Sequence, residues 1–195
     1  TLRRGEVLFN EGDSGDRLYI LLTGKVKLGH TSVDGRENLL AVLGPGEVVG
    51  ELTLFDPGPR STTATAVATT ELLALEHNQL MGFIDSHPTL AKDMLRALAV
   101  RLRRTNIALA DLVFSDVPGR VAKALLDLAE RFGAPTEDGI HVPHDLTQEE
   151  LAQLVGASRE TINKSLAEFV SRGWIRLEGR AVTLIDVERL KRRAR

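Results

Sequence analysis

A loop in the first third of the chain combines residue types that together recognise a sugar phosphate. Arg60 can donate two parallel hydrogen bonds to two phosphate oxygens, and the backbone N–H groups near Gly50 and Leu52 can hold the same anion. Ser61 adds a hydroxyl donor. Glu51 would repel a phosphate, so we expect its carboxylate to accept a hydrogen bond from a ribose hydroxyl instead. The alternative is an ion pair between Arg60 and Glu51 that only closes the loop.

Two polar neighbours, Thr105 and Asn106, could contact a ligand in a second place. Thr105 lies in a heptad stripe that is otherwise apolar, and a polar residue in such a stripe lowers the stability of a helix pair. The stripe comprises Ala91, Leu95, Leu98, Leu102, Thr105, Leu109 and Leu112. One interpretation is a polar pair that fixes the register of two helices. The other is a ligand buried against the seam and recognised by both residues.

The C-terminal third contains the pattern of two short helices joined by a turn. Thr147 with Glu150 matches a capping box, and Leu146 with Leu151 matches a hydrophobic staple, so a helix begins there. A Val-Gly-Ala turn at residues 155–157 ends this helix. The pattern predicts a helix-turn-helix, and a plain helical hairpin within a core is the alternative.

The second helix of this pair separates an apolar face from a polar one. Ser158 can cap it, and Arg159 lies in its first turn, from which a long side chain reaches forward. The residues expected in the core are Ile162, Leu166 and Phe169, and those expected to point away are Glu160, Asn163, Lys164 and Ala167. Residues 173–185, with a turn at Glu178-Gly179, predict a β-hairpin wing on which Arg180 is a candidate phosphate contact.

The elements that must position the phosphate loop are short β-strands separated by glycine turns. Six or more short strands at this spacing are typical of a jelly roll or barrel. The candidate strands are residues 6–9, 17–22, 25–29, 38–42, 62–67 and 71–75. Asp34-Gly35 is a signal for a hairpin turn of the I′ type. Residues 78–85 predict a short helix that leads into the heptad stripe.

The heptad stripe predicts a helix over residues 89–114 that pairs with its own copy. The stripe is narrow and its flanks are charged, which suits a helix pair better than one-sided docking. The expected dimer contacts are Leu95, Leu98, Leu102, Leu109 and Leu112. Residues 115–119 interrupt the pattern, and Asp116 can cap the next helix, which Gly133 ends. Residues 134–144 predict a polar loop with one short strand, and the basic residues 189–195 predict a solvated tail.

Composition excludes several classes of protein. The 195 residues include no cysteine, so disulfides, thiolate zinc sites and cysteine-ligated iron–sulfur clusters are impossible. No apolar run approaches the roughly 20 residues of a membrane span, so no membrane partner is expected. His30, directly after the predicted strand of residues 25–29, is the only histidine that adjoins a predicted strand, and no catalytic triad or carboxylate pair is evident, so we expect neither an enzyme nor a metal site. The net charge of −2 does not by itself indicate a nucleic-acid partner.

The chain resembles the CRP/FNR family of transcription regulators along essentially its whole length. Within that family it is most similar to actinobacterial cyclic-AMP receptor proteins of the GlxR type. The resemblance rests on Gly50-Glu51-Leu52 with Arg60-Ser61, on residues 34–40 (Asp-Gly-Arg-Glu-Asn-Leu-Leu), on residues 55–60 (Phe-Asp-Pro-Gly-Pro-Arg), on residues 103–106 (Arg-Arg-Thr-Asn) and on residues 158–161 (Ser-Arg-Glu-Thr). The family also has a short helical segment before the barrel, and the first residue here is Thr, so we expect a truncated or processed N-terminus.

The resemblance implies a ligand, 3′,5′-cyclic AMP, and a role for each residue. It implies that Gly50, Leu52, Arg60 and Ser61 hold the cyclic phosphate, that Glu51 binds the ribose, and that Thr105 and Asn106 contact adenine. Thr53 is a further expected ligand contact, and the strand of residues 35–41, which includes the ligand contacts Leu40 and Ala41, would form one wall of the pocket. Asn106 replaces a Ser of the enterobacterial branch. The DNA contacts implied are Thr147, Gln148, Ser158, Arg159, Glu160, Thr161, Asn163, Lys164 and Arg180. Among these, Arg159 would read guanine and Glu160 a cytosine amine.

The resulting expectation is an α+β, cytoplasmic, homodimeric regulator without a cofactor. A cyclic-nucleotide-binding jelly roll would occupy residues 1–88, a dimerisation helix residues 89–115, and a winged helix-turn-helix domain residues 116–195. Cyclic AMP would control binding to a double-stranded, palindromic operator made of TGTGA-type half-sites, and RNA polymerase is a further expected partner. The alternative is a regulator of the same fold that answers to another effector, such as cyclic GMP or haem.

Overall fold

The computed structural model describes residues 1–32, 34–35 and 37–195. The chain divides into two compact units, residues 1–108 and residues 109–195, and each is described by itself. Residues 33 and 36 lie outside the described residues. They flank the hairpin turn expected at Asp34-Gly35, and residue 36 is the arginine of the family motif.

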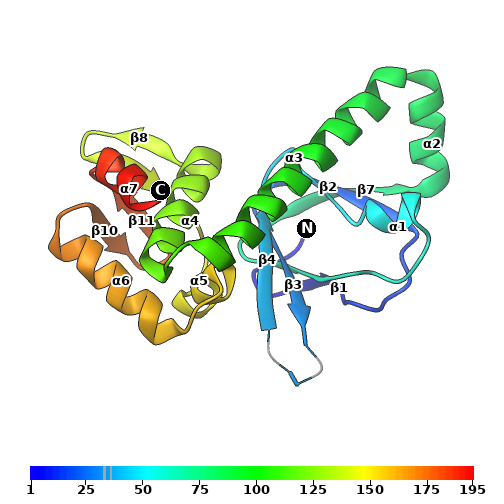
Figure 1. The fold of residues 1–195 in the computed structure, drawn as a ribbon. Helices are drawn as coiled ribbons and strands as arrows, with labels where there is room; N and C mark the ends of the chain where they lie inside the picture. The colour runs from blue at the N-terminus through cyan, green and yellow to red at the C-terminus, as the bar shows by residue number, and fades with distance from the viewer. Residues whose placement is uncertain (33, 36) are drawn as a thin grey trace. The chain divides into compact units, whose positions relative to one another are not determined.

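The first unit is built on two antiparallel sheets (Figure 1). One sheet has the order β1-β6-β3-β4, and the other has the order β5-β2-β7. The strands are β1 (Val7–Phe9), β2 (Arg17–Thr23), β3 (Val26–Thr31), β4 (Glu37–Leu43), β5 (Val48–Val49), β6 (Thr63–Ala66) and β7 (Glu71–Glu76). Side chains from both sheets, including Phe9, Leu21, Val26, Leu43 and Val49, form one buried cluster. The β-rich domain expected from the sequence is confirmed, with the two-residue strand β5 as an addition.

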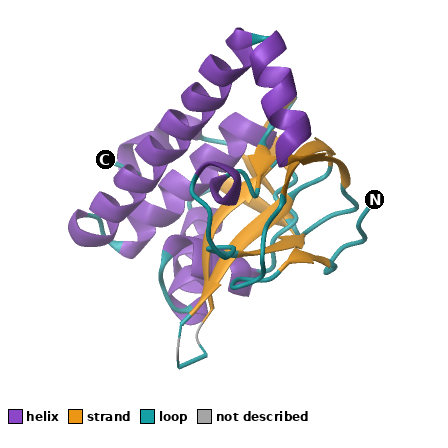
Figure 2. Ribbon diagram, turned by 90° about the vertical axis from the view of Figure 1, so that its right-hand side faces the viewer, coloured by secondary structure: helices purple, strands orange, loops and turns teal. Residues whose placement is uncertain are grey.

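Three helices complete the first unit. They are α1 (Leu52–Phe55), α2 (His77–Ser86) and the long α3 (Pro88–Phe114), which continues into the second unit. Helix α2 has His87 as its C-cap residue, and the chain turns sharply between α2 and α3 (Figure 2). Leu18, Leu54 and Leu80 form a second buried cluster, and Leu90 and Met94 of α3 pack against it. This cluster fixes the first turns of α3 against the strands, because each of its helices contributes an apolar side chain.

Helix α3 has no buried residue along its described length. Four leucines of the heptad stripe, Leu95, Leu102, Leu109 and Leu112, are 67%, 62%, 63% and 51% exposed, whereas Leu98 is half-buried. The helix extends as the sequence indicated. An apolar stripe of this length that faces solvent in a single chain is typical of a surface that pairs with another molecule.

The second unit contains four further helices and one four-stranded sheet. The elements are α4 (Val117–Phe132), β8 (Ala134–Thr136), β9 (Gly139–Val142), α5 (Gln148–Val155), α6 (Arg159–Ser171), β10 (Ile175–Glu178), β11 (Ala181–Leu184) and α7 (Val187–Arg193). The sheet order is β10-β11-β9-β8. Val121 and Leu125 of α4, Ile162 and Phe169 of α6, and Val182 of β11 are buried, so this unit has a core of its own.

Local signals in the sequence predicted most boundaries in this unit. Asp116 caps α4 through a bond from the Gly119 N–H of 3.0 Å, and Thr147 and Glu150 complete a capping box at α5. Gly156 ends α5 in the left-handed conformation at φ 70°, where glycine is favoured. The turn, the second helix and the wing hairpin follow as expected.

Two expectations for this unit were wrong. Residues 134–144 form the paired strands β8 and β9 instead of a polar loop with one strand, because β9 also pairs with β11 and joins the wing sheet. The basic tail forms helix α7, because Leu190 and Ala194 are buried and the N–H of Arg189 bonds to Asp186. In the sequence, two apolar residues among basic ones are too weak a pattern to predict a packed helix. None of the described helices combines the length and apolar character of a membrane span.

Candidate functional sites

The phosphate loop, residues 50–61, lies between β5 and β6, and two of its charged residues, Glu51 and Arg60, are buried. Arg60 is 4% exposed and Glu51 is 3% exposed. Gly50 has φ 82°, and a Cβ atom there would lie 2.5 Å from the Arg60 Nη1 atom, so both the backbone and the guanidinium require glycine. Short helix α1 begins directly after Glu51, a feature that the sequence analysis did not predict.

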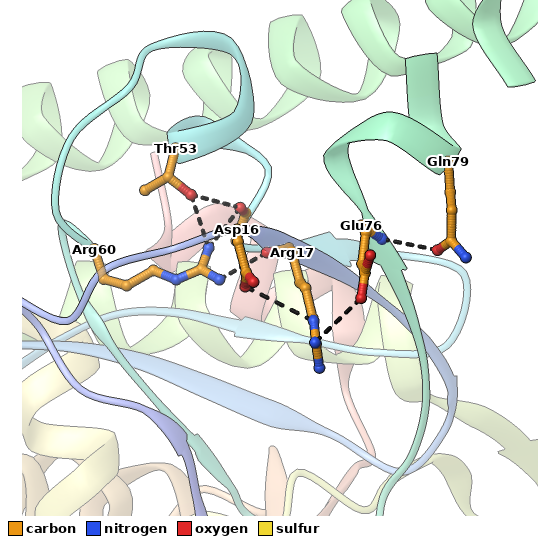
Figure 3. Close-up of polar contacts among 7 residues, drawn as sticks. Asp16, Arg17, Thr53, Arg60, Glu76 and Gln79 are labelled. Atoms are coloured by element: carbon orange, nitrogen blue, oxygen red, sulfur yellow. Dashed lines mark hydrogen bonds and ion pairs between the residues drawn. The ribbon is translucent and has the colours of Figure 1, made fainter. Parts of the chain in front are cut away.

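The Arg60 guanidinium is held by neutral oxygen atoms (Figure 3). Its Nη1 atom donates to the Gly50 carbonyl at 2.7 Å and to the Thr53 hydroxyl at 3.0 Å, and its Nη2 atom donates to the Arg17 carbonyl at 2.7 Å. The Cζ atom lies 4.4 Å from the centre of the Phe9 ring. The buried Nε atom has no hydrogen-bond partner. One edge of this fixed cation is therefore available to an anion.

Ion pairs of the Arg17 side chain stabilise the backbone segment whose carbonyl accepts a hydrogen bond from Arg60. The Arg17 side chain contacts Glu76 at 3.2 Å and Asp16 at 3.8 Å (Figure 3). The Glu76 N–H donates to the Gln79 Oε1 atom at 3.0 Å, as part of the capping box of α2. These side chains are exposed, so each pair contributes at most about 1 kcal/mol to stability. Their role is to fix the start of β2, from which the Arg17 carbonyl points to Arg60.

Glu51 pairs with Arg101 of α3 rather than with Arg60 in the described structure. The Nη1 atom of Arg101 lies 2.6 Å from Glu51 Oε1, and its Nη2 atom donates to the Val48 carbonyl at 2.6 Å. The second carboxylate oxygen of Glu51, Oε2, is buried and has no partner. Glu51 and Arg60 therefore do not form the loop-closing ion pair that was the alternative interpretation of the sequence. In the sequence, Arg101 is only one of the charged residues that flank the heptad stripe, and no local signal links it to Glu51.

These groups line one small hollow of about 30 Å³. Its lining residues are Phe9, Gly50, Glu51, Leu52, Thr53, Arg60, Ser61, Thr62 and Arg101. All six loop residues expected to surround a phosphate or ribose are thus brought together. The hollow is small beside ligand pockets of roughly 300–1,000 Å³, so a nucleotide would extend beyond it.

The remaining expected ligand contacts are not part of this hollow. Leu40 on β4 is 53% exposed, whereas Ala41 packs against the core of the strands. Thr105 and Asn106 are exposed on α3, and the Thr105 hydroxyl donates to the Arg101 carbonyl at 3.1 Å. Thr105 therefore lies one helical turn beyond the arginine that holds Glu51.

The second unit gathers four of the expected DNA contacts around one open concavity of about 510 Å³. It is lined by Thr147, Gln148, Glu149, Arg159, Gly179 and Arg180. The first three residues come from the start of α5, Arg159 from the first turn of α6, and the last two from the turn of the wing. Segments that are distant in sequence thus place two arginines at one depression, which suits a negatively charged backbone.

The polar residues of α6 differ in how freely they project. The Ser158 hydroxyl accepts the Thr161 N–H at 3.2 Å, so capping engages it. Glu160 and Lys164 form an exposed pair at 2.7 Å, and such a pair is easily opened by a competing partner. Asn163 was expected to point away, but it is half-buried and its Oδ1 atom is buried without a partner. Ile162, Leu166 and Phe169 are buried as expected.

Charged side chains tie the start of α4 to its surroundings within the second unit. Arg120 donates to the Ser115, Val155 and Gly156 carbonyls at 2.7, 3.0 and 3.1 Å. Arg193 of α7 lies 2.6 Å from the Asp116 carboxylate. This hydrogen bond, opposed by partial burial, lowers the pKa of Asp116 below its usual value and raises the pKa of Arg193. Sequence analysis identified the Asp116 cap but neither of these arginines.

No group of three or more metal-ligating side chains occurs among the residues that the structure describes.

Comparisons with known proteins cover both units. A family model for the cyclic nucleotide-binding domain matches residues 1–87, and one for the Crp-like helix-turn-helix domain matches residues 119–193. The chain is 57% identical over 192 residues to a CRP-like cAMP-activated global transcriptional regulator of Mycobacterium tuberculosis, and the match covers 98% of this chain and 86% of that protein. A cyclic AMP receptor protein of Thermus thermophilus is 40% identical over 174 residues, which cover 89% of this chain and 77% of that protein.

Solved structures agree with the sequence matches. A CRP-family transcriptional regulator from Thermus thermophilus superposes with a TM-score of 0.84 at 30% sequence identity, and the match covers 99% of this chain and 95% of that structure. A second CRP/FNR-family regulator from the same organism gives a TM-score of 0.82, also at 30% identity, over 99% of this chain and 96% of that one.

Proposed function

The chain belongs to the CRP family of DNA-binding transcription regulators, and on this premise we propose that it is a homodimer whose affinity for DNA is controlled by cyclic AMP. The names of the relatives from Mycobacterium tuberculosis and Thermus thermophilus both refer to cyclic AMP. The relatives are transcription regulators, a class without catalytic activity, so the proposal includes no enzymatic step.

The observation that carries the ligand assignment is a pair of unpartnered atoms beside one hollow. Among the described residues, Arg60 Nε and Glu51 Oε2 are buried, lack partners and belong to residues that line the same space. A cyclic nucleotide offers the complementary groups, since a phosphate oxygen accepts from the Nε–H group and the ribose 2′-hydroxyl donates to a carboxylate. Leaving such groups unpaired costs roughly 1–3 kcal/mol each, which a fitting ligand would recover.

The proposed dimer contact is the exposed face of α3. Leu95, Leu98, Leu102, Leu109 and Leu112 would pack against the same residues of a second copy, which removes an apolar stripe from water. Thr105 and Asn106 lie in and beside this stripe, so a second helix would place them near a bound adenine. The Arg101–Glu51 pair supports this arrangement because it joins α3 to the ribose side of the hollow.

The proposed DNA interface is the concavity of the second unit together with the exposed face of α6. Arg159 would fork to guanine O6 and N7, Glu160 would accept from a cytosine amine after parting from Lys164, and Lys164 would contact a base edge or phosphate. Thr147, Gln148, Ser158, Thr161, Asn163 and Arg180 would position the helix along the backbone of a palindromic TGTGA-type operator. Contact with RNA polymerase and a cytoplasmic location are proposed from the relatives' role as global regulators. The division at residues 88 and 115 stays a prediction.

The test is titration calorimetry of the purified protein with cyclic AMP and, separately, with cyclic GMP, followed by DNA binding with and without each nucleotide. We expect cyclic AMP to bind and to raise the affinity for a TGTGA-type duplex more than for a scrambled one. Heat with cyclic GMP alone would reassign the effector. Absence of heat with both nucleotides would remove the ligand assignment, and equal affinity for the two duplexes would remove the operator.

A further inference from the structure

We propose that Gly15 is a positioning residue for nucleotide binding, because its missing side chain leaves the space in which the Arg60 guanidinium lies. This inference rests on the proposed function of the hollow and adds a residue outside the loop of residues 50–61. Gly15 belongs to the turn before β2 and is not itself among the residues that line the hollow.

The space at Gly15 is already filled by two other side chains. A Cβ atom built on Gly15 would lie 2.6 Å from both Cζ and Nε of Arg60, and 2.6 Å from the Thr53 hydroxyl oxygen. Carbon atoms attract one another best at roughly 3.5–4.0 Å, so these contacts are strongly repulsive. The guanidinium therefore rests directly against the Gly15 backbone, near the atom that lacks a partner.

The turn that carries Gly15 is tied to Arg60 by its backbone. The Arg60 N–H donates to the Asp13 carbonyl at 2.8 Å, and the Gly12 N–H donates to the Arg60 carbonyl at 2.8 Å. The Asn10 N–H bonds to the Asp13 carboxylate at 2.8 Å, which closes the turn on itself. These bonds hold the two backbone segments together. The clash between a side chain at position 15 and Arg60 can therefore not be relieved by moving the turn away.

Backbone conformation does not explain the glycine. Gly12 in the same turn has φ 88°, a left-handed value that disfavours other residues, but the φ of Gly15 lies outside that region. The atoms that a methyl group would meet are the ends of two side chains rather than backbone atoms. Alanine at position 15 is therefore compatible with the fold, and the guanidinium is the group that must move.

Moving the guanidinium would disturb the contacts that aim it. Its present position satisfies the Gly50 and Arg17 carbonyls and leaves Nε unpartnered on a residue that lines the hollow. A displacement of about 1 Å breaks hydrogen bonds of 2.7 Å and turns the donor edge away from the phosphate. Gly15→Ala should therefore weaken cyclic AMP binding by about tenfold or more while the apo protein keeps its fold.

The test measures cyclic AMP affinity by calorimetry for the full chain and for Gly15→Ala, each in the Arg60 and the Arg60→Lys backgrounds. Lysine keeps the positive charge but has no guanidinium for a methyl group to displace, so we expect the loss caused by Gly15→Ala to fall from about tenfold to less than about twofold in that background. The matched control is Gly82→Ala in α2, outside the phosphate loop, where a new Cβ would meet nothing within 4 Å. This control should bind cyclic AMP as the parent does.

The outcomes separate this inference from the proposed function. A parent protein that binds no cyclic AMP overturns both. A parent that binds, with Gly15→Ala of equal or higher affinity, overturns only the role of Gly15. An equal loss in both backgrounds would show that position 15 acts through the fold rather than through Arg60. Failure of Gly15→Ala to fold would likewise overturn the inference, since the backbone would then be the group disturbed.

Discussion

At the scale of single residues, Arg60 has a structural and a binding role that substitution can separate. Arg60→Ala removes the donors to two partly buried carbonyls, so we expect a loss of roughly 1–3 kcal/mol in the free energy of unfolding. It also removes the charge-assisted contact to phosphate, so cyclic AMP affinity should fall by more than about tenfold. Chemical denaturation and titration calorimetry measure the two effects. An unchanged cyclic AMP affinity would move the phosphate site away from this loop.

The two arginines at the concavity, Arg159 and Arg180, should contribute differently to DNA recognition, one to the choice of sequence and the other to affinity for any DNA. Arg159 begins a helix whose Ile162, Leu166 and Phe169 side chains are committed to the core, so its guanidinium is free to enter a major groove. Loss of a bidentate contact to guanine costs roughly 1–3 kcal/mol at that base pair. Arg159→Ala should therefore weaken operator binding far more than binding to scrambled DNA.

Arg180 on the wing provides the matched comparison. Arg180→Ala should lower the affinity for both DNAs and reduce the slope of log affinity against log salt by about one unit, because a phosphate contact carries no sequence information. A binding series against both duplexes at several salt concentrations tests the two variants together. Equal losses on the two DNAs for Arg159→Ala would mean that another residue of α6 reads the sequence.

At the scale of elements, α7 braces the start of α4 through an ion pair that depends on pH. The hydrogen bond from Arg193 lowers the pKa of Asp116 in the folded state below its unfolded value. The pair therefore stabilises the fold above the unfolded pKa, and its contribution is lost as the pH falls through the folded pKa. Because the Asp116 side chain is 62% exposed, the contribution is less than about 1 kcal/mol.

Replacement of Arg193 tests this brace. Arg193→Gln should lower the melting temperature at pH 7 by a few degrees. The difference from the parent should shrink only as the pH falls through the lowered pKa of folded Asp116, and it should vanish below that pKa, where Asp116 is protonated in both proteins. Lys191→Gln is the matched control, because Lys191 is exposed on the same helix and its ion pair is local, with Glu188 of the same helix. A difference between Arg193→Gln and the parent that persists at low pH would assign the effect to packing of α7 rather than to charge.

The elements that the sequence predicted well are those with local signals. The caps at Asp116, Thr147 and Ser158 are satisfied within three residues of each cap, so their sequence patterns are sufficient. Helix α7 and strand β9 depend on partners far along the chain, α4 and β11, and their own patterns are weak. Strong local signals therefore determined the helix-turn-helix, whereas long-range contacts decided the elements that were wrong.

The same distinction applies to the candidate site. The loop residues Gly50 to Thr53 and Arg60 were recognisable because their chemistry is contiguous in sequence. Arg101 and Gly15 were not, because the folded chain alone brings them to Glu51 and Arg60. A lone arginine on a charged helix and a lone glycine in a turn resemble many residues without a role. Their roles depend on close approaches between atoms, which periodicity and spacing do not encode.

At the scale of the whole molecule, the seam of α3 links two proposed events, assembly and response to the ligand. Leu102 and Leu109 are exposed in the single chain, whereas Arg101 on the same helix holds Glu51 of the loop. A helix that contributes to the ligand site on one side and to a subunit contact on the other gives the ligand a preference between arrangements of the pair. Substitutions on the two faces should therefore have different consequences.

Leu102→Asp places a charge in the seam and should give monomers in sedimentation experiments, because an unpaired carboxylate buried between two helices costs far more than the apolar contact it replaces. Asn106→Ala should remain dimeric, bind operator poorly, and gain little affinity when cyclic AMP is added, because it removes a contact to the base without disturbing the seam. Asn78→Ala, at an exposed position of α2, should behave as the parent in both measurements. If the Leu102→Asp protein stays dimeric, the heptad stripe is not the subunit contact, and the adenine would then have to be recognised without a residue from a second copy at this seam.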